Sequence, residues 1–153
     1  MQTKTKRPAK PAKETVQTTA KSINLRNKDI VLANEAVMAL AQMWIPPATA
    51  MKVRRLARVI GPVADDIMAE KRKLAKLHAK LDERGEVVGD ENGKIVFKGK
   101  DDEAAFTATL TELMDVEMSL EIKPLRASEL ADLDHIQPSL LLALGDTLED
   151  DLD

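Results

Sequence analysis

The residue patterns that come closest to a chemical site lie between residues 90 and 103. Gly93 and the pair Gly99-Lys100 resemble a phosphate-binding loop, but the two glycines are one residue too far apart. In addition, Asp101 stands where such a loop needs a Ser or Thr to bind magnesium. The DENG run at residues 90–93 resembles the start of a calcium loop, yet Lys94 occupies a position that requires an oxygen ligand, and the glycine comes too early. We therefore interpret this run as a turn.

The other candidates for chemistry are isolated from one another. His78 and His135 lie far apart in the sequence, and the chain has neither an HExxH nor a GxSxG motif. The absence of cysteine excludes disulfides, thiolate zinc sites and cysteine nucleophiles. The acidic run at residues 101–103 has the charge to bind a divalent ion, but capping of a following helix already accounts for it. We expect no catalytic residue, no metal and no cofactor, and hence a protein that is not an enzyme.

The elements that carry these residues are expected to be mainly helical. Trp44, Phe97 and Phe106 are the only aromatic residues among the 153, so aliphatic side chains and methionine must fill the core. That composition favours helices over a β-sandwich. The length suits one domain, and no apolar run approaches the roughly 18 residues of a membrane span. No secretory signal is recognisable at the N-terminus, which favours a cytoplasmic origin.

One long amphipathic helix is predicted from Thr49 to Arg84, ended by Gly85. Pro62 lies inside it and is expected to kink it without breaking it. Steps of three and four residues along this segment give a stripe that is apolar at all positions except Glu70. The stripe is Val53, Leu56, Ile60, Val63, Ile67, Glu70, Leu74, Leu77 and Leu81.

A shorter helix should precede the long one. Asn27 is a suitable N-cap, and the apolar stripe of this helix includes Val37 and Leu40 and ends at Trp44. The helix must stop at Ile45, because Pro46 and Pro47 disfavour α geometry before them. A two-proline corner between two helices predicts an αα-hairpin that brings Val37 or Leu40 against Val53 or Leu56.

The second half of the chain predicts smaller elements. A β-hairpin is expected at residues 86–98, a third helix begins at Asp101 or Asp102, and alternation at residues 116–122 indicates a half-buried strand. That strand could join the hairpin in a three-stranded antiparallel sheet. Ser128 can cap a short helix and Pro138 can open another, with Gly145 past its end. The fold class is therefore mainly α (α+β): a long αα-hairpin, a small antiparallel β-hairpin or sheet, and short C-terminal helices.

Charge is distributed unevenly along the chain. Residues 1–28 carry eight Lys/Arg against Glu14, a net +7, and residues 129–153 carry eight Asp/Glu and no Lys/Arg, a net −8. We expect residues 1–22 to be a basic arm, either disordered or ordered by a partner, residues 23–148 to form a single elongated domain, and residues 149–153 to fray as an acidic tail.

Twelve residues are candidates for interaction. The arm can release counterions from nucleic acid or dock on an acidic protein, whereas the basic residues near the corner are scattered around their helix. The leucines of the C-terminal run either cover the hairpin or sheet, which we favour, or form an exposed docking helix. The candidates are Lys4, Lys6, Arg7, Lys10, Lys13, Lys52, Arg54, Arg55, Arg58, Leu141, Leu144 and Leu148.

The order of these pieces resembles a family of small, mainly helical proteins of tailed bacteriophages. The resemblance covers about residues 24–150, through Leu25-x-Asn27-x-x-Ile30, a second helix rich in Glu-x-x-Lys, an alternating strand before KPL at 123–125, and a closing Pro138-x-x-Leu141. The basic arm and Gly61-Pro62 depart from that pattern. The resemblance implies a phage-encoded, non-enzymatic accessory protein, located in the host bacterial cytoplasm or the virion, and it brings no catalytic or binding residues.

Three functional hypotheses remain open. The first is a virion structural or assembly component that contacts other phage structural proteins. The second is an inhibitor or adaptor of a host protein, in which the acidic tail imitates nucleic acid. The third is a nucleic-acid-binding regulator that uses the basic N-terminal arm, since three aromatics placed mostly in core positions cannot form a stacking groove. We expect no membrane partner, and the sequence leaves oligomerisation open.

Overall fold

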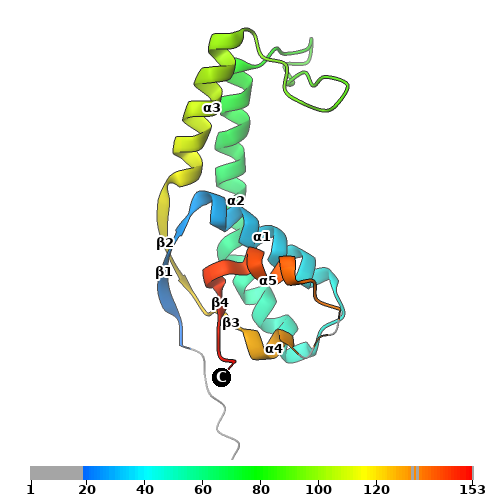
Figure 1. Cartoon of the computed structure of the whole chain (residues 1–153), viewed down its shortest axis with the longest axis vertical. Coiled ribbons are helices and arrows are strands. Elements are labelled where there is room, and N and C mark those ends of the chain that lie inside the picture. Colours follow the sequence, from blue (N-terminus) through cyan, green and yellow to red (C-terminus); the bar gives the residue numbers. More distant parts are fainter. Residues whose placement is uncertain (1–18, 132, 134, 153) are drawn as a thin grey trace, which may run out of the picture.

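A computed structural model describes residues 19–131, 133 and 135–152 of the chain. The molecule is elongated, and a single helix, α2 (Pro47–His78), runs along most of its length (Figure 1). With 32 residues at about 1.5 Å each, α2 reaches roughly 48 Å. The helix remains continuous through Pro62. One end of it belongs to a broad base with both β-sheets, and the other end carries a narrow stalk.

The core lies in the base, where α1 (Asn27–Gln42) packs against the first half of α2. Val37 and Leu40 of α1 and Val53 and Leu56 of α2 are all buried in the same hydrophobic cluster, which confirms the predicted αα-hairpin. The two helices turn at Pro46 and Pro47, as predicted, but α1 ends three residues before Ile45.

The buried face of α2 follows a different path from the predicted stripe. Val53, Leu56, Ile60 and Ile67 are buried as expected. Farther along, Ala64 and Ala75 are buried instead of Val63 and Leu74, and Leu77 is 63% exposed. The predicted positions advance by about 3.5 residues per turn, whereas a straight helix advances by 3.6, so the two drift apart by about 20° every seven residues.

The long helix ends at His78, six residues earlier than predicted, because a local turn competes with it. The carboxylate of Asp82 accepts hydrogen bonds from the amides of Arg84 and Glu86 at 2.8 and 2.9 Å. Gly85 closes this turn with a φ of 76°, a conformation that favours glycine. Side chains of this type stabilise turns at the expense of helix.

The predicted turn at residues 90–93 is present and repeats the first turn eight residues later. Asp90 accepts the amides of Asn92 and Lys94 at 2.8 and 2.9 Å, and Gly93 has a φ of 74°. The hairpin here is held by an isolated bridge between Gly89 and Ile95, and its two arms do not form a continuous β-ladder.

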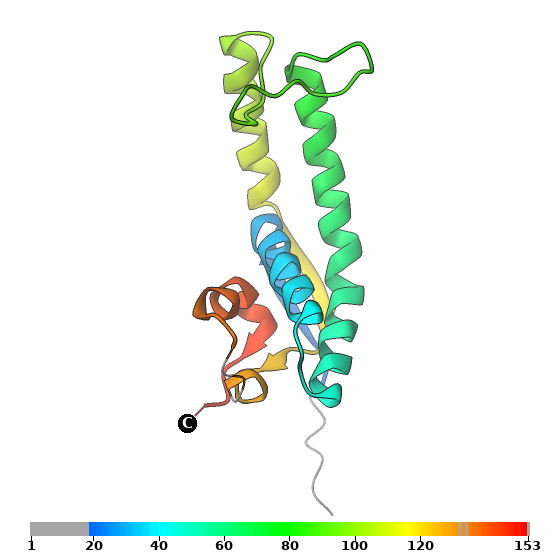
Figure 2. The same cartoon turned by 90° about the vertical axis from the view of Figure 1, so that its right-hand side faces the viewer.

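The two turns form a small knob at the tip of the stalk, residues 79–99 (Figure 2). Backbone hydrogen bonds link Lys80, Val88 and Val96 in a closed ring: Lys80 donates to Val96, Val96 to Val88, and Val88 to Lys80, at 2.8 to 2.9 Å. Phe97 of the knob packs on Phe106 of the following helix, with the centroids of the two rings 5.2 Å apart. Helix α3 (Lys100–Asp115) returns from the knob along the second half of α2 (Figures 1 and 2).

The predicted three-stranded sheet is wrong. Strand β2 (Glu117–Ile122) forms, but it pairs antiparallel with β1 (Lys21–Arg26), with Leu25 opposite Met118. The hairpin lies at the other end of α3, about 24 Å away for a helix of 16 residues, so β2 cannot reach it. Lys21 and Ser22, which were assigned to the arm, therefore belong to the folded domain. The remainder of the arm, residues 1–18, lies outside the described residues.

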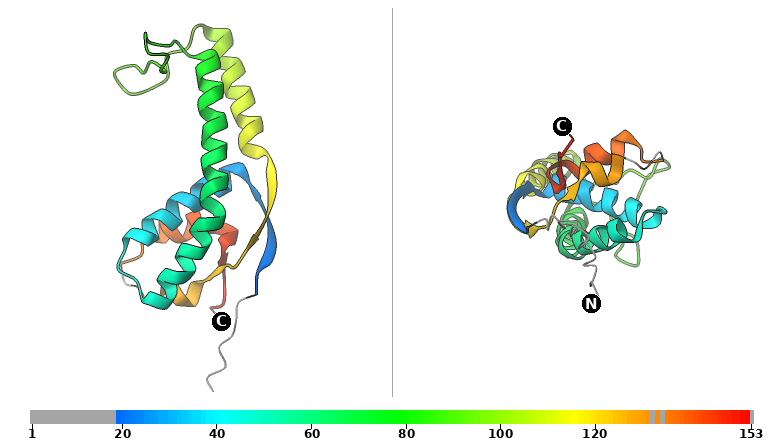
Figure 3. Two further views of the ribbon diagram at one scale, coloured as in Figure 1. Left: turned by 180° about the vertical axis from the view of Figure 1, so that it is seen from behind. Right: turned by 90° about the horizontal axis from the view of Figure 1, so that it is seen from below.

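The C-terminal elements close the base beside α1. Strand β3 (Leu125–Arg126) pairs in parallel with β4 (Leu148–Glu149), and between them come α4 (Ala127–Ala131), α5 (Pro138–Leu144) and the short 3₁₀ helix η1 (Gly145–Thr147). Helix α5 lies against α1 (Figure 3). Pro138 opens α5 and Gly145 follows it, as predicted.

Candidate interaction surfaces

The corner between α1 and α2 exposes the largest apolar side chain of the protein. Trp44 is 83% exposed and Met51 is 50% exposed, and both line a groove of about 440 Å³. Met43 and Ala50 line it as well, and Arg54 provides a cation. Large exposed apolar side chains grouped in this way are typical of binding surfaces. We call this feature the corner groove.

The position of Trp44 corrects the sequence prediction that placed it in the buried stripe of the first helix. That helix ends at Gln42, and Met43 already has extended backbone geometry with φ −84° and ψ 155°. The helical periodicity that points Leu40 into the core therefore no longer applies to Trp44. Ile45 takes the inward position instead and is 8% exposed. The signal available in the sequence was the Pro46-Pro47 pair, which begins two residues after Trp44 and disfavours helical geometry in the residue before it.

The structure separates the basic residues that were predicted near the corner. Lys52 forms an ion pair with Glu129 of α4, so its charge is already matched. Arg54 lines the corner groove, whereas Arg55 lines a different cleft between α2 and the end of β2. Arg58 is exposed one helical turn after Arg54, on the same face of α2. Within the described part of the chain, these three arginines form no salt bridge.

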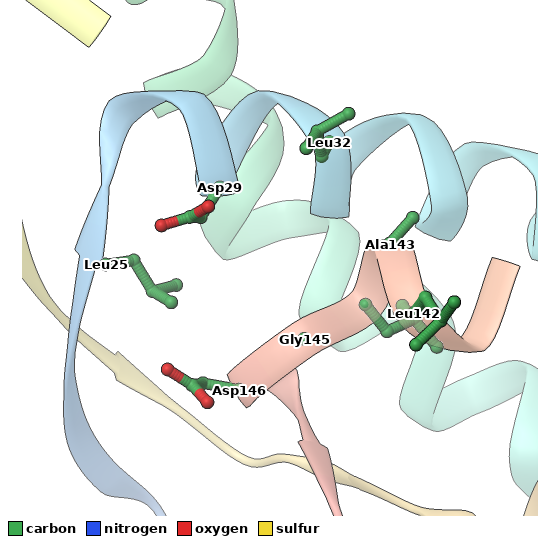
Figure 4. A pocket seen from close by; sticks show the side chains of 8 residues that line it. Leu25, Asp29, Leu32, Leu142, Ala143, Gly145 and Asp146 are labelled. Carbon is green, nitrogen blue, oxygen red and sulfur yellow. The ribbon is translucent and has the colours of Figure 1, made fainter. Parts of the chain in front are cut away.

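An acidic pocket of about 260 Å³ lies between α1 and α5. In Figure 4, the carboxylates of Asp29 and Asp146 lie at one end of it with Leu25, and Leu32 and Leu142 lie toward the other. Asp146 also lines an adjoining groove between β1 and β4. This pocket was not predicted from the sequence, because Asp29 and Asp146, a residue of η1 directly after α5, line the same pocket only when α5 packs on α1.

The described part of the C-terminal tail, residues 149–152, is attached to the body, which corrects the prediction that residues 149–153 fray; Asp153 lies outside the described residues. Glu149 belongs to β4 and pairs with Lys21 at 3.5 Å. Asp151 accepts hydrogen bonds from the backbone amide of Ser128 at 2.8 Å and from its hydroxyl at 2.6 Å. Both bonds lower the pKa of Asp151 from its ordinary value, and the bond from the Ser128 hydroxyl has the larger effect. Leu152 follows and is 58% exposed.

The leucines proposed as an alternative docking surface lie against the body. Leu144 is 1% exposed and belongs to the core, so it cannot contact a partner in this fold. Leu141 and Leu148 are half-buried and pack against the same core. The exposed docking helix is therefore not observed for these three residues, but the structure also differs from the favoured prediction that they cover the hairpin or sheet. These leucines belong to α5 and β4, and α5 packs against α1 and not against the predicted hairpin or three-stranded sheet.

The described residues do not form a recognisable reaction centre. The Nδ1 atom of His78 lies 3.1 Å from an Asp102 oxygen, which ties the end of α2 to the start of α3. No group of three or more potential metal ligands occurs among the described residues. In that same part of the chain, no helix has the length and apolar character needed to cross a bilayer. Lys4, Lys6, Arg7, Lys10 and Lys13 lie outside the described residues.

Comparisons with protein families, with curated proteins and with solved structures found no match to this chain. The corner groove is therefore identified as a candidate binding surface from its geometry alone. It combines one exposed aromatic side chain, two methionines and one arginine whose charge is unmatched among the described residues.

Proposed function

We propose that the protein is a non-catalytic assembly component that acts through protein–protein contacts. The order of its elements resembles that of small phage proteins. Our specific hypothesis is therefore a virion structural or assembly protein of a bacteriophage. The observation that carries the proposal is the corner groove. A tryptophan that is 83% exposed beside an apolar cleft provides the kind of anchor that dominates protein interfaces.

The shape of the molecule supports the same function. The core is confined to the base, while the stalk of α2 and α3 extends away from it and ends in the knob (Figure 1). Such a body offers separated contact surfaces, as a component that bridges neighbours in an assembly requires. The charged side chains of the knob, including Asp82 and Asp90, are held by local turns that keep its shape constant.

The test is to look for the chain by mass spectrometry in purified particles of the phage that encodes it. We expect the intact chain in a fixed ratio to the major capsid protein. A variant with Trp44→Ala should be lost from the particles, whereas Leu77→Ala, which removes another exposed apolar side chain far from the groove, should be retained. Particles that lack the wild-type chain, although infected cells contain it, would exclude a virion component.

The exposed arginines favour nucleic-acid binding as a second candidate function. Arg54, Arg55 and Arg58 are free to contact phosphates, and the basic arm adds further cations. This function predicts binding to duplex or single-stranded DNA that weakens steeply as salt rises. Triple replacement of the arginines by glutamine should reduce it, and removal of residues 1–18 should reduce it independently. Binding to a host protein in place of a virion protein would show as one stoichiometric host partner in infected cells.

A further inference from the structure

The C-terminal tail carries an exposed apolar side chain, Leu152, and an exposed carboxylate, Asp150, whereas none of the described residues that line the corner groove has a carboxylate. Ser128 holds the carboxylate of Asp151, and the amide of Leu152 donates to the Asp150 carboxylate at 3.2 Å. The backbone of the tail is thereby fixed, while the side chain of Leu152 stays 58% exposed and Asp150 is exposed beside it. The tail presents an apolar side chain with an adjacent negative charge.

The corner groove offers the complementary arrangement. Its walls are apolar, with Trp44, Met43 and Met51, and Arg54 stands at the same groove with Arg58 one turn beyond. Methionine side chains adapt readily to a branched aliphatic group. A ligand for this groove must therefore bring a bulky apolar side chain and a carboxylate close together.

We propose that the corner groove of one copy binds the C-terminal tail of a second copy, with Leu152 between Trp44 and Met51 and Asp150 facing Arg54. The proposal rests on the proposed function as an assembly component and names the partner of its contact surface. Groove and tail are different surfaces, so the contact is head-to-tail and each copy uses both. Contacts of this kind generate rings or filaments when they repeat.

Two other occupants fit the groove less well. The basic arm of the chain carries five Lys/Arg against Glu14 within residues 1–18, so Arg54 and Arg58 would repel it. Nucleic acid would meet methionine and alanine in the walls, with Trp44 as the single aromatic face there. A peptide with an apolar side chain and a carboxylate satisfies both the walls and the charge.

Trp44 is the only tryptophan in the chain, so its fluorescence reports on the groove alone. Interfaces that bury less than about 1,200 Å² are usually weak, so the protein concentration should be raised to about 1 mM. We expect the emission of wild-type protein to shift to the blue and its quenching by iodide to fall as concentration rises. Leu77→Ala should behave like wild type, and Leu152→Ala should show neither change.

A mixing experiment distinguishes a second copy from other occupants. The variant Leu152→Ala keeps the groove, and Arg54→Glu with Met51→Glu keeps the tail, so each alone should remain monomeric by light scattering. Their mixture should form a species of twice the chain mass that does not grow further. Exchange of charges, with Arg54→Glu and Asp150→Arg in one chain, should restore the association that either single change weakens.

Three outcomes would overturn the proposal: wild-type protein that remains monomeric throughout the series, emission that is already shifted and independent of concentration, or a mixture that stays monomeric. Burial of Trp44 only by an added acidic protein or by DNA would likewise exclude the second copy. Failure here leaves the proposed function intact if the chain is still found in particles. Conversely, self-association of a chain that is absent from particles would reject a role in the virion and retain this inference.

Discussion

Asn27 shows how much one side chain contributes to the joint between the base and the stalk. Its Nδ2 atom donates to the carbonyl of Leu113 at 2.8 Å, and its backbone amide donates to the carbonyl of Val116 at 2.9 Å. Both carbonyls belong to the end of α3, where helical partners are missing. The sequence predicted an N-cap, but Arg26 holds that position and Asn27 is 4% exposed.

Replacement of Asn27 by alanine should lower the free energy of unfolding by about 1 to 3 kcal/mol, because it removes the side-chain donor from a partly buried carbonyl at the end of α3. Asn24→Ala is the matched control, since Asn24 is exposed on β1 and forms no side-chain hydrogen bond within the described residues. Its effect should stay within about 0.5 kcal/mol. Urea denaturation of both variants measures the difference. Equal values would show that the joint does not depend on the Asn27 side chain.

The hydrogen bond between Ser128 and Asp151 predicts a dependence on pH. The pKa of Asp151 is lowered in the folded protein, mainly by the Ser128 hydroxyl, so the stabilisation is present above the ordinary value of 3.8. It is lost as pH falls from there through the lower, folded pKa. Ser128→Ala should therefore reduce thermal stability at neutral pH more than at acid pH. A difference between variant and wild type that does not shrink on acidification would contradict this assignment.

At the scale of elements, α2 unites the molecule by packing with two helices in succession. Its first half lies against α1 in the base and its second half against α3 in the stalk (Figure 2). Gly61 lies near the middle, and the atom nearest to an added Cβ there would be Asn34 Oδ1 at 3.8 Å, an ordinary contact distance. Apart from its immediate neighbours in the chain, no contact with a described residue therefore requires glycine at this position.

Gly61→Ala should raise the free energy of unfolding by about 0.5 to 1 kcal/mol, because glycine costs helix stability relative to alanine. Gly93→Ala provides the opposite control, since Gly93 has a φ of 74° that alanine adopts poorly. Thermal melts should therefore move in opposite directions for the two variants. A loss of stability for Gly61→Ala would show that α2 needs flexibility before Pro62.

The base should depend on the side chains that α2 contributes to it. Leu56 and Ile60 are 2% and 0% exposed, so replacing either with alanine should cost about 2 to 5 kcal/mol. Lys76→Ala and Leu77→Ala should cost little, because both side chains are exposed on the stalk. Urea melts of the four variants test this ranking, and similar small losses in all of them would contradict a core centred on α2.

At the scale of the whole molecule, the boundary of the fold lies before Lys21. Residues 21–26 form β1, and Leu25 is 4% exposed in the core. Removal of residues 1–18 should leave the melting temperature nearly unchanged, whereas removal of residues 1–25 should lower it strongly because β2 loses its partner. A large loss of stability on removing residues 1–18 would show that the arm packs on the body.

Removal of residues 1–18 should also weaken binding to acidic partners. The binding of the full-length chain to such partners should weaken as the salt concentration rises.

Periodicity and proline placement in the sequence determined the helical core. The stripe through Val53, Leu56 and Ile60, the corner at Pro46 and Pro47, and α5 between Pro138 and Gly145 could all be predicted, because each depends on residues close together in the chain. Only the tertiary structure decided which strand β2 joins and which residues meet around a pocket. The length of α3 separates β2 from the hairpin, and the packing of α5 on α1 brings Asp29 to Asp146. Trp44 became exposed because α1 ended one turn early, and such boundaries depend on long-range packing that local sequence does not contain.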